Sequence, residues 1–433
     1  MKKFKMNFLA PFTGAFFGLM IFAASGCVKQ EASKAEDAAS QPAVISTAQS
    51  AEIAEAQKII EKMPEAANGY NKLAVAYIRR ARETGDFSLN TNAQTAVNRA
   101  LEIAPENFEA QKLKASLLLT FHQFGEALNF GKQLEASHKQ DAFVYGVLTD
   151  ANVELGNYKE AAEAVQRMVD LRPNMESYAR VAQVRSLYGD SDGALEAMSI
   201  AARVADPADK EAQAWCLTFL GNEFFKVGRF EEAEKQYDGA LKILPDYHLA
   251  LAGKGHARAA FADYENAVRF FTQTQTRVPS TEVVIALGDV YAKTGNAEKA
   301  AEQYKLAEFI EQKLGNLDQR RLALLWADQD TKLDEALAIA TREHQTRKDI
   351  YTADVYAWCL YKKGDFQAAK TAITEALRMK TKDARMFYHA GMIEKQLGNK
   401  KAAIDHLQKA LQTNPSFDVL QAERAKTALQ ELS

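Results

Sequence analysis

The side chains that could do chemistry lie scattered along this chain of 433 residues, and no motif brings them together. The metalloprotease pattern H-E-x-x-H, the nucleophile elbow G-x-S-x-G, the Walker A loop and the dinucleotide-binding G-x-G-x-x-G do not occur in full. The histidines are His122, His138, His248, His256, His344, His389 and His406. The two nearest, His248 and His256, lie about 12 Å apart along a helix, too far to share one metal ion. The sequence therefore predicts no enzyme, no metal site and no cofactor.

Charge and composition limit the kinds of partner. The 54 Lys and Arg residues almost balance the 57 Asp and Glu residues, so the formal net charge of −3 offers no strong positive field for phosphate backbones. Nucleic acid is therefore not expected as a partner. Apolar residues make up 47% of the chain and charged residues 26%, which is typical of a chain that folds around a core. The small numbers of Gly and Pro, 22 and 9, favour helices over hairpin-rich sheets.

The first residues have the layout of an export signal. Three lysines within the first five residues precede an apolar run over residues 9–24, which ends in small side chains. The tetrapeptide A-S-G-C that ends at Cys27 resembles the end of a bacterial lipoprotein signal peptide, although that family usually has leucine where Ala24 stands. The resemblance implies that residues 1–26 are removed and that Cys27 is lipidated. The alternatives are an uncleaved membrane anchor, which Pro11 disfavours, and an ordinary cleaved signal.

Lipid attachment at Cys27 would tether the mature protein to a membrane, because several acyl chains hold a protein there stably. Within the lipoprotein family an aspartate directly after the cysteine commonly retains a protein at the inner membrane, whereas this chain has Val28. The resemblance therefore implies the outer membrane, with the protein facing the periplasm. The segment after the cysteine is rich in Ala, Ser, Gln and charge, so residues 27–50 are expected to form a disordered, flexible linker that reaches about 25 to 30 Å.

One pattern recurs with a period close to 34 residues. In its clearest copy the apolar, small and turn-forming residues are Leu217, Leu220, Gly221, Phe224, Gly228, Ala233, Tyr237, Ala240 and Pro245. The alanine that opens the second half of each copy falls at Ala93, Ala127, Ala161, Ala194, Ala233, Ala267, Ala300, Ala336, Ala369 and Ala403. These ten copies cover residues 67–416, and their spacing resembles the tetratricopeptide repeat, a family of helix-turn-helix units.

The resemblance implies an all-α, right-handed tetratricopeptide solenoid of about ten helix-turn-helix repeats. Each helix pair has two apolar faces, so neighbouring copies must stack to bury them, and the curvature of the stack produces a concave groove. Residues 51–66 are expected to form a leading capping helix and residues 417–433 a closing one. Because copies in a solenoid are expected to contact only their neighbours, Cys216 in the fifth copy and Cys359 in the ninth should not form a disulfide. Both are expected to be buried structural thiols.

Candidate binding residues follow from the expected groove. In the tetratricopeptide family the first helix of each copy lines the concave side, and residues two, five, nine and twelve of the copy point towards a ligand. In the fifth, ninth and tenth copies these positions are rich in aromatic side chains, which suit an extended peptide or a sugar ring. The predicted groove residues are Trp215, Asn222, Phe225, Tyr351, Asp354, Trp358, Tyr361 and Tyr388. The alternative interpretation is that these large side chains pack successive first helices together.

A non-enzymatic scaffold is the expected function, namely a lipid-anchored periplasmic protein whose groove binds a protein partner. Its layout resembles that of tetratricopeptide lipoproteins in envelope assembly or secretion machinery. The aromatic residues of the ninth and tenth copies leave open a carbohydrate-binding scaffold in exopolysaccharide export. A further alternative is an accessory subunit of an envelope enzyme. A clamp for a partner's terminal carboxylate is not expected, because only Asn222 fits that scheme and the lysines around it are missing.

Overall fold

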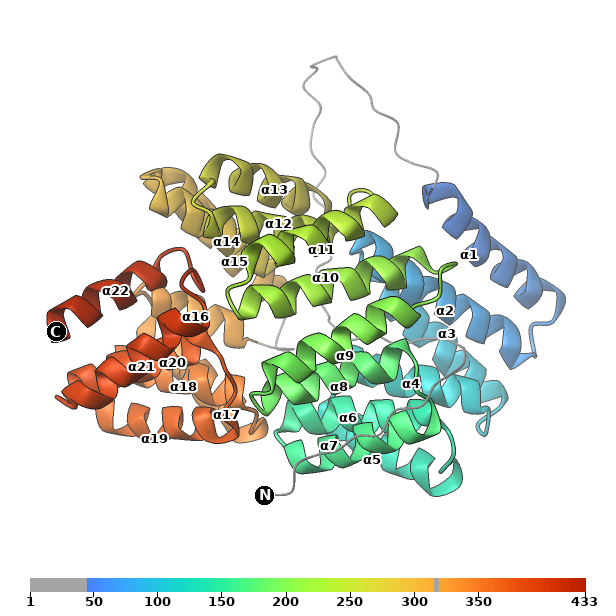
Figure 1. Ribbon diagram of the computed structural model, residues 1–433. Helices are drawn as coiled ribbons and strands as arrows, with labels where there is room; N and C mark the ends of the chain where they lie inside the picture. Colours follow the sequence, from blue (N-terminus) through green and yellow to red (C-terminus); the bar gives the residue numbers. More distant parts are fainter. Residues whose placement is uncertain (1–44, 315–318) are drawn as a thin grey trace, which may run out of the picture.

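The computed structural model describes residues 45–314 and 319–433, and these residues form helices joined by short loops (Figure 1). The described residues contain 22 α-helices, one 3-10 helix (Leu377–Met379) and no strand, so the predicted all-α solenoid fold is confirmed. No helix among them has the length and apolar character needed to cross a membrane. The predicted signal peptide, Cys27 and the linker up to residue 44 lie outside the described residues.

Ten consecutive helix pairs correspond to the ten predicted copies. The first five are α2 (Ala67–Thr84) with α3 (Leu89–Ile103), α4 (Phe108–Thr120) with α5 (Phe124–Ser137), α6 (Ala142–Leu155) with α7 (Tyr158–Leu171), α8 (Met175–Leu187) with α9 (Ser191–Val204), and α10 (Lys210–Lys226) with α11 (Phe230–Ile243). The last five are α12 (His248–Ala260) with α13 (Tyr264–Arg277), α14 (Thr281–Lys293) with α15 (Ala297–Leu314), α16 (Arg320–Asp328) with α17 (Leu333–Thr346), α18 (Ile350–Lys362) with α19 (Phe366–Ala376), and α20 (Ala384–Gln396) with α21 (Lys400–Thr413).

A single helix covers each end of this array. The closing helix, α22 (Gln421–Leu432), lies within the predicted residues 417–433. The leading helix, α1 (Ile45–Lys62), starts earlier than expected, so residues 45–50 belong to the helix and not to the linker. Packing against α2 holds this helix in place, since Ala56 is 1% exposed.

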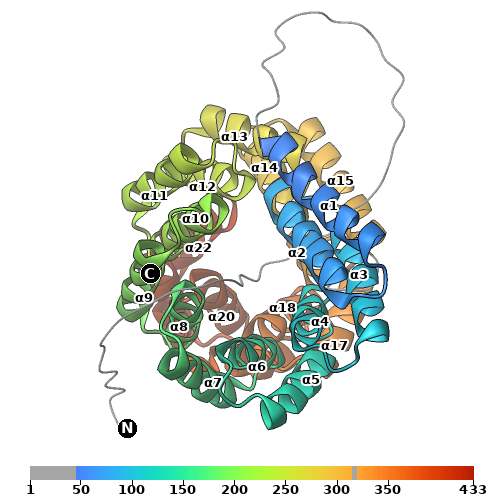
Figure 2. The same cartoon turned by 90° about the vertical axis from the view of Figure 1, so that its right-hand side faces the viewer.

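The alanine markers explain how each pair closes. The first helix of each copy, which has an even number, faces the inside of the solenoid, and the second, odd-numbered helix lies outside (Figure 2). All ten marker alanines are buried, with 0 to 3% of their surface exposed. A methyl group at this position lets the two helices approach closely, whereas a larger side chain would hold them apart.

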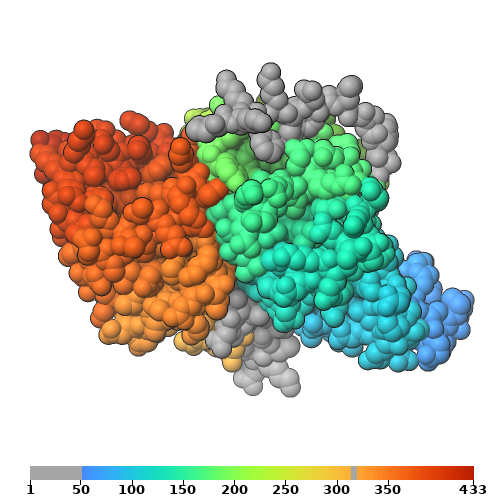
Figure 3. All heavy atoms as spheres, turned by 90° about the horizontal axis from the view of Figure 1, so that it is seen from below, coloured from blue at the N-terminus to red at the C-terminus, as the bar shows by residue number. Residues whose placement is uncertain are grey.

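The solenoid completes one superhelical turn and begins another, so distant copies touch. Residues 67–277 form the first superhelical turn, and residues 281–432 form the second, which packs against its face (Figures 2 and 3). Four hydrogen bonds cross this contact between residues 189 to 194 positions apart. They join Arg347 to Glu154, Ile350 to Tyr158, Thr381 to Leu187 and Asn414 to Phe225. The expectation that copies contact only their neighbours is therefore wrong.

We call this contact between the two superhelical turns the seam. On its first side lie the loops between the two helices of a copy, as at Gly156 and Gly189. On its second side lie the loops between copies, around Lys348 and Lys380, and a Cβ added to either glycine would overlap one of their carbonyl oxygens. Both glycines also have a positive φ, near 79° and 76°. Glycine is thus required at these loops for backbone conformation and for the close approach of the second superhelical turn.

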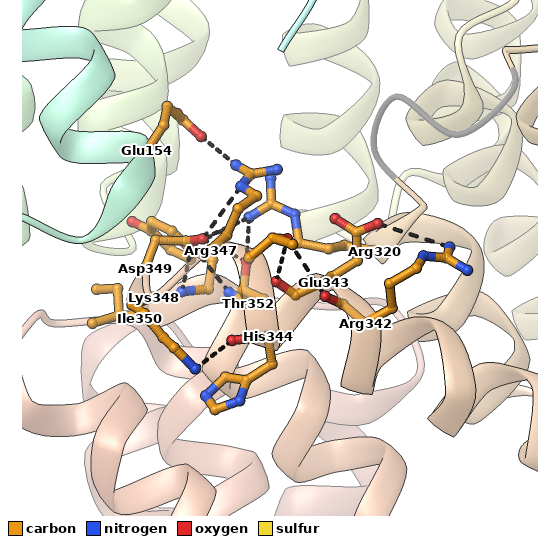
Figure 4. A network of polar contacts seen from close by, with 12 residues as sticks. Glu154, Arg320, Arg342, Glu343, His344, Arg347, Lys348, Asp349, Ile350 and Thr352 are labelled. Carbon is orange, nitrogen blue, oxygen red and sulfur yellow. Dashed lines mark hydrogen bonds and ion pairs between the residues drawn. The ribbon is translucent and has the colours of Figure 1, made fainter. Parts of the chain in front are cut away.

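A buried polar network stabilises the centre of the seam (Figure 4). Asp349, 3% exposed, accepts hydrogen bonds from the first backbone N–H groups of α18 and from Arg320 Nη1 at 3.2 Å. Arg347 lies 3.6 Å from the same carboxylate and donates across the seam to Glu154. Beside it, the backbone N–H of Ile350 donates to the Tyr158 hydroxyl at 2.8 Å. Because these groups are paired with one another, burial of the charges is compensated.

Candidate partner-binding channel

One position of the repeat determines much of the inner surface. The second residue of the copy lines a cavity in each of the nine copies in which the structure describes that residue. These residues are Asn68, Glu109, Phe143, Glu176, Trp215, Leu249, Glu282, Tyr351 and Arg385. They share one face of the even-numbered helices, so the solenoid presents a different side chain from each copy to the space it encloses.

Four cavities adjoin one another along this inner surface. Their volumes are about 850 Å³ near α1 and α2, about 290 Å³ near α12, about 440 Å³ in the middle and about 500 Å³ near α22. Shared lining residues connect them: Arg82 lines the first two, Trp215 the second and third, and Arg321 the third and fourth. We call the four together the channel and the 440 Å³ member the central cavity.

The walls of the central cavity come from both superhelical turns. The first turn contributes α6, α8 and α10, and the second contributes α14, α16 and α18. Trp215 and Phe219, one helical turn apart on α10, stack with ring centroids 4.2 Å apart. Tyr351 on α18 lines the same cavity and is 42% exposed. The cavity is therefore complete only when the two superhelical turns lie together.

Charged side chains in the central cavity are held in pairs. Arg180 on α8 donates two hydrogen bonds to Asp150 on α6, from Nε at 2.9 Å and from Nη2 at 2.6 Å. The two side chains are only 8% and 6% exposed. Burial raises the pKa of Asp150, and the neighbouring Arg180 guanidinium opposes that rise. The parallel pair of hydrogen bonds holds α6 and α8 in register beside the cavity.

Three predicted groove residues are instead part of the core. Trp358 and Tyr388 are each 1% exposed, and Asp354 is 5% exposed. The Trp358 indole stacks on the His389 ring with centroids 4.1 Å apart and donates from Nε1 to Asp328 at 2.7 Å. Asp354 lies 2.9 Å from the Nδ1 atom of His389. The expectation that these side chains are open to a ligand is wrong, because successive first helices pack through them, as the alternative interpretation held.

Of the remaining five predicted residues, four line the channel and Tyr361 does not. Trp215 and Tyr351 line the central cavity, Asn222 lines the cavity near α12, and Phe225 lines the cavity near α22. Asn222 accepts a hydrogen bond from the Tyr237 hydroxyl at 2.9 Å, so its amide is partly engaged by its own copy. Tyr361 is half-buried and stacks on Trp358 at 4.7 Å. The structure thus brings together only Trp215 and Tyr351 from the predicted set in the central cavity.

Sequence reasoning missed several residues of the central cavity. Phe219 is four residues after Trp215 on α10, and this spacing alone places it on the same helix face. Leu324 and Val355 belong to the second superhelical turn. No sequence signal indicates that they face Trp215, because their proximity depends on the pitch of the whole solenoid.

The family model of the tetratricopeptide repeat matches residues 220–281 and 357–416. These segments fall in the fifth to sixth and the ninth to tenth helix pairs, where the sequence pattern is most regular. Within these two segments the chain matches the tetratricopeptide repeat, and the ten helix pairs together form an all-α solenoid.

Two curated proteins resemble the chain at low identity. Anaphase-promoting complex subunit 3 of Schizosaccharomyces pombe is 24% identical over 305 residues, which cover 68% of this chain and 44% of the relative. The TPR repeat-containing protein MJ1428 of Methanocaldococcus jannaschii is 23% identical over 354 residues, which cover 75% of this chain and 61% of the relative. The chain thus spans less than two thirds of the length of either.

Among solved structures, a human IFIT1 dimer with m7Gppp-AAAA aligns with a TM-score of 0.49 and 14% identity, over 85% of this chain and 87% of that one. A thermophilic TPR protein of Thermus thermophilus aligns with a TM-score of 0.38 and 22% identity, over 48% of this chain and 98% of that one.

Proposed function

Because the chain is a solenoid of tetratricopeptide repeats, we propose that it is a non-enzymatic scaffold that binds a protein partner in its channel. The observation that carries this proposal is the central cavity, where Trp215, Phe219 and Tyr351 line one space of about 440 Å³. Concave, largely apolar sites with a few aromatic anchors are typical of surfaces that bind a partner segment. The relative in fission yeast is by its name a subunit of a larger complex, which agrees with such a role.

The thiols and the charged groups of the described residues support a non-enzymatic role. Burial raises the pKa of the Cys359 thiol to about 12, and it also raises that of Cys216, so neither is an activated nucleophile. Both thiols are free and buried. In the central cavity the carboxylates are tied to arginine or lysine partners, which leaves no paired acid and base facing open space among the residues that line it.

The proposal places the protein at the inner face of the outer membrane, attached by a lipid on Cys27. The motif at Cys27 and the absence of an aspartate after it support this location. Replacement of Cys27→Ser is expected to move the protein from the membrane fraction to the soluble periplasmic fraction. Continued membrane retention of the variant would instead identify the apolar run over residues 9–24 as an uncleaved anchor.

Envelope assembly or secretion machinery is the proposed setting, by analogy with the layout of tetratricopeptide lipoproteins. The carbohydrate alternative depended on aromatic faces in the ninth and tenth copies. Trp358 and Tyr388 are buried there, so Tyr351 is left as the one largely exposed aromatic ring of that set, and a single ring is a poor platform for a sugar chain. We therefore propose a protein partner alone.

Site-specific photo-crosslinking tests the proposal. A photoreactive phenylalanine at position 351, inside the central cavity, is expected to capture one defined protein from intact envelopes. The matched control carries the same group at position 309, since Phe309 is similarly exposed (49% against 42%) but lies on the outer helix α15 and lines none of the four cavities. Capture of the same protein from both positions, or from neither, would contradict partner binding in the channel.

A further inference from the structure

Resting on the proposed function, we infer that the central cavity accepts an uncharged apolar anchor of the partner, an aromatic or large aliphatic side chain. The partner would then be an extended polypeptide that places such a side chain between the two superhelical turns. A terminal carboxylate, a phosphate group or a basic side chain would be rejected. Three features of the cavity lead to this inference: its balanced charges, its apolar walls and its size.

The charges that line the central cavity are already neutralised by the protein. Nine of its lining side chains are charged, and each has an oppositely charged partner. The pairs are Asp150 with Arg180, Glu154 with Arg347, Glu223 with Lys226, Glu282 with Arg321 and Asp349 with Arg320. A charged ligand group would have to break one of these pairs or remain uncompensated away from water, and both are unfavourable.

Apolar surface remains available on opposite walls. Trp215 and Phe219 provide it from the first superhelical turn, and Leu324 and Tyr351 provide it from the second. Trp215 and Phe219 are half-buried, and Tyr351 is 42% exposed, so an inserted side chain would cover apolar area that now faces solvent. Each Å² covered contributes about 25 cal/mol, so an apolar anchor large enough to contact both walls is favoured.

The size of the cavity agrees with this anchor. A volume of about 440 Å³ lies at the lower end of the range that is usual for drug-sized ligands. It is sufficient for an indole or phenyl ring with the flanking backbone, but too small for a folded element such as a helix with its side chains. The occupant is therefore a side chain of an extended segment.

The cavity near α22 provides an internal contrast. Five carboxylates and four basic side chains line it, namely Glu282, Asp289, Asp328, Asp418 and Glu423 with Lys293, Arg321, Arg385 and Lys426. Burial, with Asp418 and Asp328 nearby, raises the pKa of Asp289 well above its usual value. Asp289 therefore tends to hold its proton there, whereas each carboxylate that lines the central cavity is paired with a basic side chain.

Three indole probes that differ in charge test the inference on the full chain. They are N-acetyl-tryptophanamide (neutral), N-acetyl-tryptophan (anionic) and tryptamine (cationic), with binding measured by ligand-observed NMR. The neutral probe is expected to bind roughly tenfold more tightly than the anionic one at the central cavity. The Tyr351→Ala and Phe219→Ala variants should each weaken its binding by roughly fivefold to tenfold, whereas the Phe309→Ala control should not.

Several outcomes would overturn the inference. Equal or tighter binding of the anionic probe would do so, as would neutral-probe binding that is unchanged by Tyr351→Ala. Neutral-probe affinity that falls as the protein concentration rises would make a second copy of the chain the occupant. Photo-crosslinking from position 351 to residues 1–44 of the same chain would make that segment the occupant.

The inference and the proposed function fail separately. If position 351 captures a partner protein while the probes show no preference for the neutral form, the channel binds a partner by other chemistry and only the inference falls. If the probes behave as expected while position 351 captures no protein, the cavity has the stated chemistry and the scaffold function falls.

Discussion

The two superhelical turns are built from the same repeat but meet different surroundings. In the first turn, the glycines of the loops within copies, such as Gly156 and Gly189, pack against the backbone of the second turn. In the second turn, Gly364 and Gly398 have the same left-handed conformation, but an added Cβ would meet no atom within 4 Å. A glycine in these loops is therefore required only for its left-handed backbone conformation in the second turn. In the first turn it is required both for that conformation and for close contact with the other turn.

The aromatic residues differ between the superhelical turns in a related way. Trp215 of the first turn lines the channel, whereas Trp358 of the second turn is buried among its neighbours. They occupy different positions of the copy, the second and the ninth. In the ninth and tenth copies stacked rings enclose the residue at position nine, since the Trp358 indole stacks with both Tyr361 and His389. The aromatic ring of Trp215 is thus open to the channel beside the seam, whereas the ring of Trp358, nearer the end of the array, is part of the core.

The largest effect is expected from truncation of the buried tryptophan. Trp358→Ala should lower the free energy of unfolding by about 3 to 5 kcal/mol, because it leaves a cavity and removes the indole N–H from Asp328. Trp215→Ala should lower it by less than about 2 kcal/mol, because that ring is only half-buried. Urea titration followed by circular dichroism measures both.

A similar loss for the two tryptophan variants would break the contrast between a channel aromatic and a core aromatic. The matched binding measurement is photo-crosslinking from position 351 in both backgrounds. Partner capture should fall with Trp215→Ala while the fold is kept, which separates the loss of a binding surface from the loss of stability.

The seam itself predicts the second effect. Gly156→Ala and Gly364→Ala place a Cβ on residues with φ near 79° and 82°. Because the left-handed conformation is unfavourable for alanine, each substitution should lower the free energy of unfolding by about 1 to 2 kcal/mol. Only the first should lose a further 1 to 3 kcal/mol, roughly, because the new Cβ overlaps the Lys348 carbonyl. The difference between the unfolding free energies of the two variants therefore measures the cost of disturbing the seam contact alone.

Hydrogen exchange locates that loss. In Gly156→Ala the backbone N–H of Ile350, which donates to Tyr158 across the seam, is expected to exchange faster than in Gly364→Ala. Equal unfolding free energies and equal exchange would mean that the two superhelical turns do not stay in contact in solution.

Local packing within a copy was predictable from the sequence, and contact between superhelical turns was not. The marker alanines gave the ten helix pairs because each acts within one copy. Gly156 and Gly364 look alike in sequence, and the seam arises only from small rotations summed over about six copies. Position two pointed inward as the helix period requires, whereas the aromatic at position nine was ambiguous because either neighbouring helices or a ligand could cover it.

The smallest effect concerns two carboxyl groups where the first copy of the first superhelical turn contacts the fifth copy. Glu83 on α2 lies near Glu211 on α10, and its Oε2 atom is buried without a hydrogen-bond partner among the described residues. Glu211 is held by Arg82 at 3.3 Å and by the Tyr247 hydroxyl at 3.0 Å. Burial, reinforced by Glu211, raises the pKa of Glu83 to about 7.

This raised pKa predicts a loss of stability as pH rises. Between the usual pKa of about 4.5 and the folded value of about 7, the folded chain keeps the proton on Glu83 while the unfolded chain has released it. Stability therefore falls across this window, by about 1 kcal/mol once solvent screening of a partly exposed group is allowed for. Glu83→Gln should remove that slope and be more stable than the parent protein at pH 8, while Glu431→Gln on exposed α22 should leave it in place. An unchanged slope in Glu83→Gln would show that the first and fifth copies do not hold their carboxylates together, and that the first superhelical turn is more open than the seam implies.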